Sequence, residues 1–323
     1  FWKIDLSKEL NITLNPDFGQ IESDEVVVNF SSVETFYSDK RPFFSENQSL
    51  FDVKDSLFRI INTRRIGGRP DYDCSRFDEE TFCNENKIGS NDIDYAIRYS
   101  QKGSVDFGFL GASERDEKFS NGRDFYALRL NTSSDGLTYG YLGTYVNKPF
   151  YDSNAQVNSF DFEYRPSKEY RYTGNIIHSD IESGEGYGLR AGYRFDPNQD
   201  FHLGGSFLYL DNKIDLNDMG YLALNNRAMF NGRTQFKTTN FSKGSIFRSR
   251  MFEWGYGFKA DSNFRKQAGN TAFKIESSFI DTSDMVSEIF YRTSGRDFRI
   301  TRKSPLAPYI NMPEGYGGYV EYN

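Results

Sequence analysis

The sequence has few of the residues that metal centres, helical membrane bundles and nucleic-acid-binding surfaces need. It holds 2 Cys and 2 His among 323 residues, which leaves almost no ligands for a His/Cys metal site. No segment approaches the roughly 20 consecutive apolar residues of a membrane-spanning helix. Its 39 Lys and Arg against 46 Asp and Glu give a net charge of −7, which argues against the basic surface of a nucleic-acid-binding protein. We therefore expect no metal, no cofactor and no nucleic-acid partner.

Aliphatic residues are also scarce, and aromatic residues take their place. Apolar residues make up 37% of the chain, below the roughly 45–50% of an average soluble domain. Aromatic residues reach 17%, with 31 Phe and 22 Tyr, whereas disordered chains are poor in aromatics. Leu and Ala are too few for a large helical core. The composition therefore predicts an all-β protein.

Alternation with a period of two residues dominates the chain. In 159–165 and 252–259, for example, aromatic residues alternate with charged residues or glycine, so each strand has an aromatic face and a polar face. The clearest runs have about nine to eleven residues, the length that a tilted strand needs to cross a bilayer. We predict roughly fourteen strands, at 10–14, 58–63, 93–99, 105–111, 125–130, 138–146, 159–165, 170–178, 187–195, 201–210, 252–259, 271–280, 287–291 and 316–322.

Two architectures share this pattern. A soluble sandwich or propeller would pack the aromatic faces together, whereas an antiparallel transmembrane β-barrel would turn them to lipid and its polar faces to a lumen. Small and charged residues mix on the polar faces, and many apolar faces begin or end in Tyr or Trp, as interface girdles do. A propeller would also need a repeat of roughly 40–50 residues, which the sequence lacks. We therefore predict a transmembrane β-barrel of roughly fourteen strands.

Two segments depart from the alternation. Apolar residues recur at helical spacing in 23–37, which predicts a short helix near the N-terminus, inside a plug or rim segment over 15–56. An acidic loop over 71–90 holds Cys74 and Cys83. We expect a disulfide between them, as in envelope proteins exposed to an oxidising space, with two free thiols as the alternative.

No catalytic constellation emerges. The sequence contains no G-x-S-x-G nucleophile motif, and we expect His178 and His202 to be girdle or lumen residues. Paired carboxylates of a glycosidase must lie roughly 5–10 Å apart, a distance that the sequence does not give. We name no catalytic residue.

Charges of both signs and consecutive aromatic residues cluster between Asn15 and Phe44. We interpret the cluster as an ion-paired plug, with a binding site as the alternative, because structural ion-pair networks imitate functional ones. Its candidate residues are Asp17, Glu34, Lys40 and Arg41, and the family resemblance described next adds Arg64 and Arg65.

Several of these stretches resemble the signature of a bacterial outer-membrane β-barrel domain of unknown function that typically follows a family-9-like carbohydrate-binding module. The matching stretches are Asn15–Gln20, Val28-Asn29, Glu34–Phe36, Lys40–Phe44, Arg64–Gly67 and Asp215–Gly220. The sequence departs from the signature at Ser38-Asp39, where Pro-Glu is usual, and at Asn47, where Gly is common. The family barrel is also longer, so we expect residues 1–323 to be a barrel domain within a longer polypeptide.

The resemblance implies a location in the outer membrane of a Gram-negative cell, among lipid and lipopolysaccharide. Within it we predict a surface anchor, or a pore for a glycan or other polymer, with an envelope protein as a further partner. A non-enzymatic role is favoured. The alternative is a cell-surface hydrolase acting on polysaccharide, because some family members carry a hydrolase label that rests on the attached module.

Overall fold

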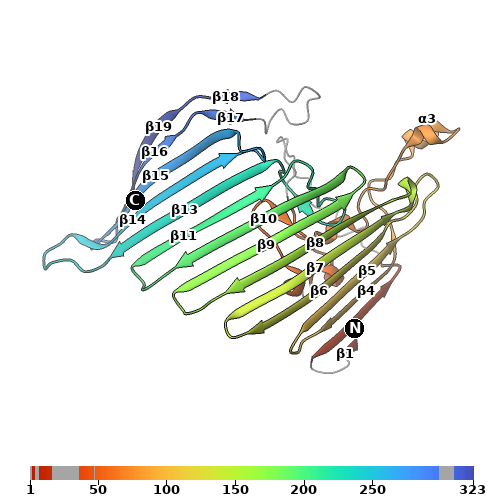
Figure 1. Cartoon of the computed structure of the whole chain (residues 1–323), viewed down its shortest axis with the longest axis horizontal. Helices are drawn as coiled ribbons and strands as arrows, with labels where there is room; N and C mark the ends of the chain where they lie inside the picture. The colour runs from red at the N-terminus through yellow and green to blue at the C-terminus, as the bar shows by residue number, and fades with distance from the viewer. Residues whose placement is uncertain (1, 4–6, 17–35, 47, 298–308) are drawn as a thin grey trace.

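The computed structural model describes residues 2–3, 7–16, 36–46, 48–297 and 309–323, and most of them form one antiparallel sheet (Figure 1). The sheet has 15 strands, and almost every strand pairs with its neighbour in sequence. The prediction of an all-β chain with about fourteen strands is confirmed. Among the described residues β1 and β19 are the two edges of the sheet, so closure into a barrel stays a prediction. The strands of this sheet are β1 (Trp2–Lys3), β2 (Lys8–Leu14), β4 (Ile93–Gln101), β5 (Asp106–Glu114), β6 (Asp124–Ser134), β7 (Leu137–Lys148), β8 (Ser153–Tyr164), β9 (Tyr170–Ile181), β10 (Gly184–Phe195), β11 (Phe201–Leu210), β13 (Arg227–Thr238), β14 (Phe247–Ala260), β15 (Lys266–Phe279), β16 (Asp284–Arg292) and β19 (Gly315–Tyr322).

The remaining elements are short and lie in the connections. Strand β3 pairs with β12, and β17 pairs with β18, in two separate two-stranded sheets. No helix among the described residues is long and apolar enough to span a membrane. These elements are β3 (Phe58–Arg59), β12 (Tyr221–Leu222), β17 (Gly295–Asp297), β18 (Ile310–Met312), the helices α2 (Pro42–Ser45) and α3 (Glu80–Glu85), and the 3-10 turns η1 (Gln48–Phe51), η2 (Thr63–Arg65), η3 (Cys74–Arg76) and η4 (Pro149–Tyr151).

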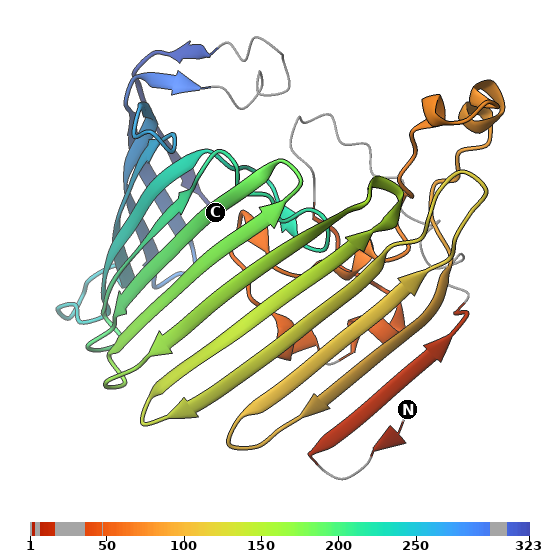
Figure 2. The same ribbon diagram turned by 45° about the vertical axis from the view of Figure 1, so that its right-hand side comes forward.

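The sheet is strongly curved (Figure 2). Its convex face carries exposed aromatic and aliphatic side chains. Strand register places them in rows, because Phe160 pairs with Tyr141 on one side and with Ile176 on the other. Phe160 is 59% exposed and Ile176 is 58% exposed. The aromatic faces of the strands therefore point away from the concave side and do not meet in a shared core.

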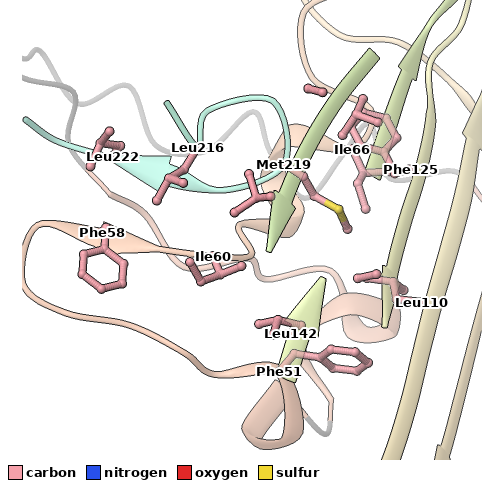
Figure 3. Close-up of a cluster of buried hydrophobic side chains, with 14 of the residues drawn as sticks. Phe51, Phe58, Ile60, Ile66, Leu110, Phe125, Leu142, Leu216, Met219 and Leu222 are labelled. Carbon is pink, nitrogen blue, oxygen red and sulfur yellow. The ribbon is translucent and has the colours of Figure 1, made fainter. Parts of the chain in front are cut away.

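The concave face is covered in part by residues 36–46 and 48–66, here called the inner segment (Figure 2). Its apolar side chains pack against small and aliphatic residues of β4 to β11, and Leu216 and Met219 of the β11–β13 connection join the same core (Figure 3). Two arginines of the sheet hold the inner segment. Arg98 on β4 donates to the carbonyls of Phe43 and Glu46 at 2.5 and 2.6 Å, and Arg190 on β10 donates to Asp55 at 2.6 Å.

The connections at the two ends of the strands differ in length, and each set of strand ends forms one edge of the curved sheet. At one edge the strands are joined by short turns, such as 102–105, 135–136 and 165–169. At the other edge, here called the long-loop edge, the connections 115–123 and 211–226 join β5 to β6 and β11 to β13, and the long connections from β2 to β4 and from β16 to β19 begin and end there. Short turns on one side and long loops on the other are typical of outer-membrane barrels.

One strand prediction is wrong, and one long strand was missed. Residues 58–63 do not join the main sheet, because only β3 forms there and it pairs with β12. Strand β13 was not predicted, although it pairs along its whole length with β14. Its outward face contains Gly232, where a Cβ would come within 2.3 Å of the Tyr256 ring of β14. The glycine makes room for that aromatic ring and so interrupts the alternation in the sequence. The helix predicted for 23–37 lies almost entirely outside the described residues.

Candidate functional site

Arg41, one of the predicted cluster residues, is the centre of a buried network in the inner segment. Its side chain is 2% exposed and forms an ion pair with Asp39, which is equally buried, at 2.8 Å. It also donates to the carbonyl oxygens of Ile66 at 2.8 Å and Thr63 at 2.7 Å. Asp39 accepts in turn from the Thr63 hydroxyl at 2.7 Å. Arg41 thus joins the start of the inner segment to its end, and its planar guanidinium suits such a set of acceptors.

Arg65 joins the two motif regions that lie far apart in the sequence. It donates through Nε to the carbonyl of Gly220 at 3.1 Å and through Nη2 to Asn217 Oδ1 at 3.1 Å. The Asn62 amide donates to the Met219 carbonyl at 2.7 Å. At Gly220 a Cβ would lie 2.6 Å from the carbonyl oxygen of Arg59, so only glycine allows this approach. The motif Asp215–Gly220 is therefore the packing partner of Arg64–Gly67.

The other predicted cluster residues are placed less tightly or not described. Arg64 is half-buried, and its guanidinium lies 5.8 Å from the Tyr37 ring centre. Lys40 is exposed. Asp17 and Glu34 lie outside the described residues. The structure thus places Arg41, Arg64 and Arg65 in the inner segment. Arg41 and Arg65 form hydrogen bonds within the protein there.

A second charged network lies at the long-loop edge, beside the inner segment. Arg123 and the fully buried Glu114 form an ion pair at 2.9 Å, and Glu114 also accepts from the Gly67 amide at 2.8 Å. Nearby, Asp71 has one buried carboxylate oxygen without a hydrogen-bond partner. Burial raises the pKa of Asp71 above its ordinary value, against the attraction of Arg123 and Lys148. Ionised Asp71 is therefore held here at a cost in stability.

The acidic loop contains the predicted disulfide. Cys74 and Cys83 are bonded, with their Cα atoms 5.6 Å apart. Both cysteines are buried in a small apolar cluster with Phe119 of the β5–β6 connection. The bond closes a compact unit that includes α3 and projects from the long-loop edge (Figure 1).

A polar cavity of about 290 Å³ opens at the long-loop edge, where β11 ends and β13 begins. Sequence reasoning missed it, because its residues come from the connections 211–226 and 261–265 and from β13, β15 and the β17–β18 hairpin. The one available signal was the density of asparagine beside the motif Asp215–Gly220. Its lining is Asn212, Leu224, Asn225, Asn226, Arg227, Asp261, Arg265, Gln267, Arg296 and Tyr309.

Positive charge exceeds negative charge in this cavity. Three arginines line it, and Asp261 is the single carboxylate among the lining residues. Asp261 is already engaged, because it accepts from Arg265 Nε at 2.5 Å and from the Asn263 and Arg265 amides. Arg296 lies over the Tyr309 ring, 4.2 Å from its centre. The cavity does not supply a facing pair of carboxylates, and the described residues contain no cluster of three or more His, Cys, Asp or Glu that could hold a metal ion.

Comparison with known proteins gives a family match to part of the chain and a distant likeness to solved structures. Residues 2–108 match a family described as a domain of unknown function (DUF5916). Among solved structures, the chain is similar to a "Bacterial polysaccharide outer membrane secretin", with 9% identity over 71% of this chain and 77% of that chain and a TM-score of 0.37. A TM-score of this size does not establish a shared fold. No curated protein matches the chain.

The family match confirms the expected similarity to a domain of unknown function for the N-terminal third of the chain. It includes the motif stretches from Asn15–Gln20 to Arg64–Gly67 and ends before Asp215–Gly220. The upstream carbohydrate-binding module and the outer-membrane location remain predictions.

Proposed function

We propose that this chain belongs to a transmembrane β-barrel of the Gram-negative outer membrane. The observation that carries the proposal is the convex face of the sheet. Phe160, Phe162 and Ile176 are 46–59% exposed within paired strands, and the same face of the sheet carries Trp254, which is 52% exposed on β14. A soluble protein rarely exposes so large a contiguous apolar surface, whereas lipid would cover it.

The geometry of the strands and the concave face support the same proposal. Strands β6 to β11 have 10–12 residues, and a tilted spanning strand needs roughly 9–11. The uncovered part of the concave face carries ion pairs, such as Arg171–Glu163 and Lys274–Glu276, as a water-filled lumen would require. The disulfide-bearing loop at the long-loop edge would face the cell exterior, where disulfides persist.

Within the membrane, the chain would act as a surface anchor, or as a pore for a glycan or other polymer. The inner segment would narrow the lumen, because Arg98 and Arg190 fix it against opposite parts of the sheet. A pore would then conduct beside the inner segment, along the charged part of the concave face. Lipid, lipopolysaccharide and an envelope protein are the partners expected for either role.

The test is fractionation of the native protein with and without detergent, followed by gel mobility with and without boiling. We expect membrane association, extraction by detergent and a mobility shift on boiling. A protein that is soluble without detergent and shows no shift would refute the barrel. Conductance in planar bilayers would then separate a pore from an anchor.

A further inference from the structure

The polar cavity at the long-loop edge combines two kinds of recognition chemistry. Arg265 and Arg296 present guanidinium groups, which pair with carboxylates in a planar, two-pronged geometry. Asn212, Asn225 and Gln267 line the same space, and their amides can both donate to and accept from hydroxyl groups. A ligand that offers both a carboxylate and hydroxyl groups is a sugar acid.

The two arginines remain accessible to a ligand. The Arg265 side chain is 63% exposed, although its Nε contacts Asp261. Arg296 is exposed on β17 and stacks on Tyr309, which holds its planar group in one orientation. Asp261 is 3% exposed and held by backbone amides, so it screens only part of the positive charge.

The placement of Arg296 is built into the backbone. Thr293, three residues before Arg296, donates its backbone amide to the Gly269 carbonyl at 3.0 Å. At Gly295 a Cβ would lie 2.3 Å from the backbone nitrogen of Ala268 on β15. The absence of a side chain at Gly295 lets β17 lie directly on β15 and sets Arg296 at the cavity.

We infer that this cavity binds a carboxylated sugar unit of an acidic polysaccharide. This inference rests on the proposed function, since it names the polymer class that would meet the barrel. The volume of about 290 Å³ is at the lower end of ligand sites, roughly 300–1,000 Å³, so the cavity suits one or two sugar units rather than a long segment. Arg265 and Arg296 would bind the carboxylate, and the amides would bind the hydroxyl groups.

The test is calorimetric titration of the purified full chain with three probes: tetragalacturonate, the neutral tetrasaccharide maltotetraose and the non-sugar anion tripolyphosphate. We expect tetragalacturonate to bind at least about tenfold more tightly than either of the others, because maltotetraose lacks the carboxylates and tripolyphosphate lacks the sugar hydroxyl groups, and each set of hydrogen bonds contributes a factor of this order. Its binding should weaken as salt increases. Equal affinity for maltotetraose, tighter binding of tripolyphosphate or no binding of tetragalacturonate would overturn the inference.

Matched variants locate the site. Arg265→Gln and Arg296→Gln should each weaken tetragalacturonate binding about tenfold. Arg248→Gln, which removes the same charge from the opposite end of β14, should leave it unchanged. If Arg248→Gln loses as much affinity as the other two, the cavity is not the site. The lysine variants R265K and R296K keep the charge and should recover part of the affinity, which a merely structural role would not predict.

The mobility shift on boiling, measured on the same preparation, separates the two proposals. A shifted protein without selective binding refutes the ligand and leaves the barrel standing. An unshifted, soluble protein refutes the barrel, whatever it binds.

Discussion

Replacing Arg41 by leucine should destabilise the inner segment more than the same change at Arg64 or Arg65. The substitution leaves the buried Asp39 carboxylate without its ion-pair partner and removes the donors to the Ile66 and Thr63 carbonyls. Breaking a buried ion pair by removing one partner costs roughly 3–5 kcal/mol. Total unfolding free energies are about 5–15 kcal/mol, so this loss should be easy to measure.

The other two arginines provide a graded control. Arg65→Leu removes two hydrogen bonds to the Asp215–Gly220 motif, and we expect a cost of about 1–3 kcal/mol. Arg64→Leu removes a cation–π contact at 5.8 Å, worth at most about 1 kcal/mol at a partly exposed site. The sequence gives no ranking among these three residues. The contacts in the structure predict that the loss of stability is largest for Arg41, smaller for Arg65 and smallest for Arg64.

The assay combines denaturant unfolding in detergent with limited proteolysis of the inner segment. Proteolysis matters because the segment can detach while the sheet stays folded. The double variant Asp39→Ala/Arg41→Leu should lose less unfolding free energy than the sum of the losses in the two single variants. The reason is that each single substitution leaves the charge of the other residue buried without its partner, whereas the double substitution leaves none. An Arg41→Leu protein within about 1 kcal/mol of the wild type, or no worse than Arg64→Leu, would refute the reasoning.

Three further predictions follow from other parts of the molecule. Phe160→Arg places a charge on the convex face and should cost roughly 2–4 kcal/mol in a bilayer, measured by refolding into lipid vesicles, whereas Ser167→Arg in the exposed 165–169 turn should cost almost nothing. Asp71→Asn should stabilise the long-loop edge at pH 7 but not at pH 3. Burial raises the folded-state pKa of Asp71 above 3.8, so the wild-type protein has its full stability below the unfolded-state pKa and loses part of it as pH rises through the folded-state pKa. Equal protease resistance of variant and wild type at both pH values would contradict this. Replacing Cys74 and Cys83 by serine should cost the 71–90 loop about 2–3 kcal/mol and speed its proteolysis, with the heat stability of the sheet as the quantity that should not change.

The periodicity of the sequence was enough to predict most of the sheet. Aromatic residues alternate clearly over 160–164 in β8 and over 252–258 in β14, and the antiparallel pairing of neighbouring strands follows from short connections. Strand β13 was not predicted, because Gly232 stands where the alternation calls for a large apolar residue. The Tyr256 ring of the next strand fills the space beside this glycine. When a neighbouring strand supplies the side chain that covers a position, the local sequence alone does not show it.

The candidate site was predictable only where residues lie close together in the chain. The motif stretch Lys40–Phe44 indicated a charged plug, and Arg41 does form a buried network. Its acceptors, however, include backbone carbonyls of Ile66 and Thr63, which no residue pattern reveals. The polar cavity is assembled from separate connections and strands, so its arginines looked like unrelated loop charges.

The depth of Trp254 in a lipid bilayer tests the account most directly. Trp254 lies in the middle of β14 on the convex face, and its indole N–H donates to the Thr271 hydroxyl at 2.9 Å, so it can face lipid with its polar group satisfied. In a Trp2→Phe variant, Trp254 is the single tryptophan of the chain. The account predicts strong fluorescence quenching by lipids brominated near the bilayer centre and little quenching by aqueous acrylamide. Quenching by acrylamide without quenching by brominated lipid would place the convex face in water and contradict the central claim.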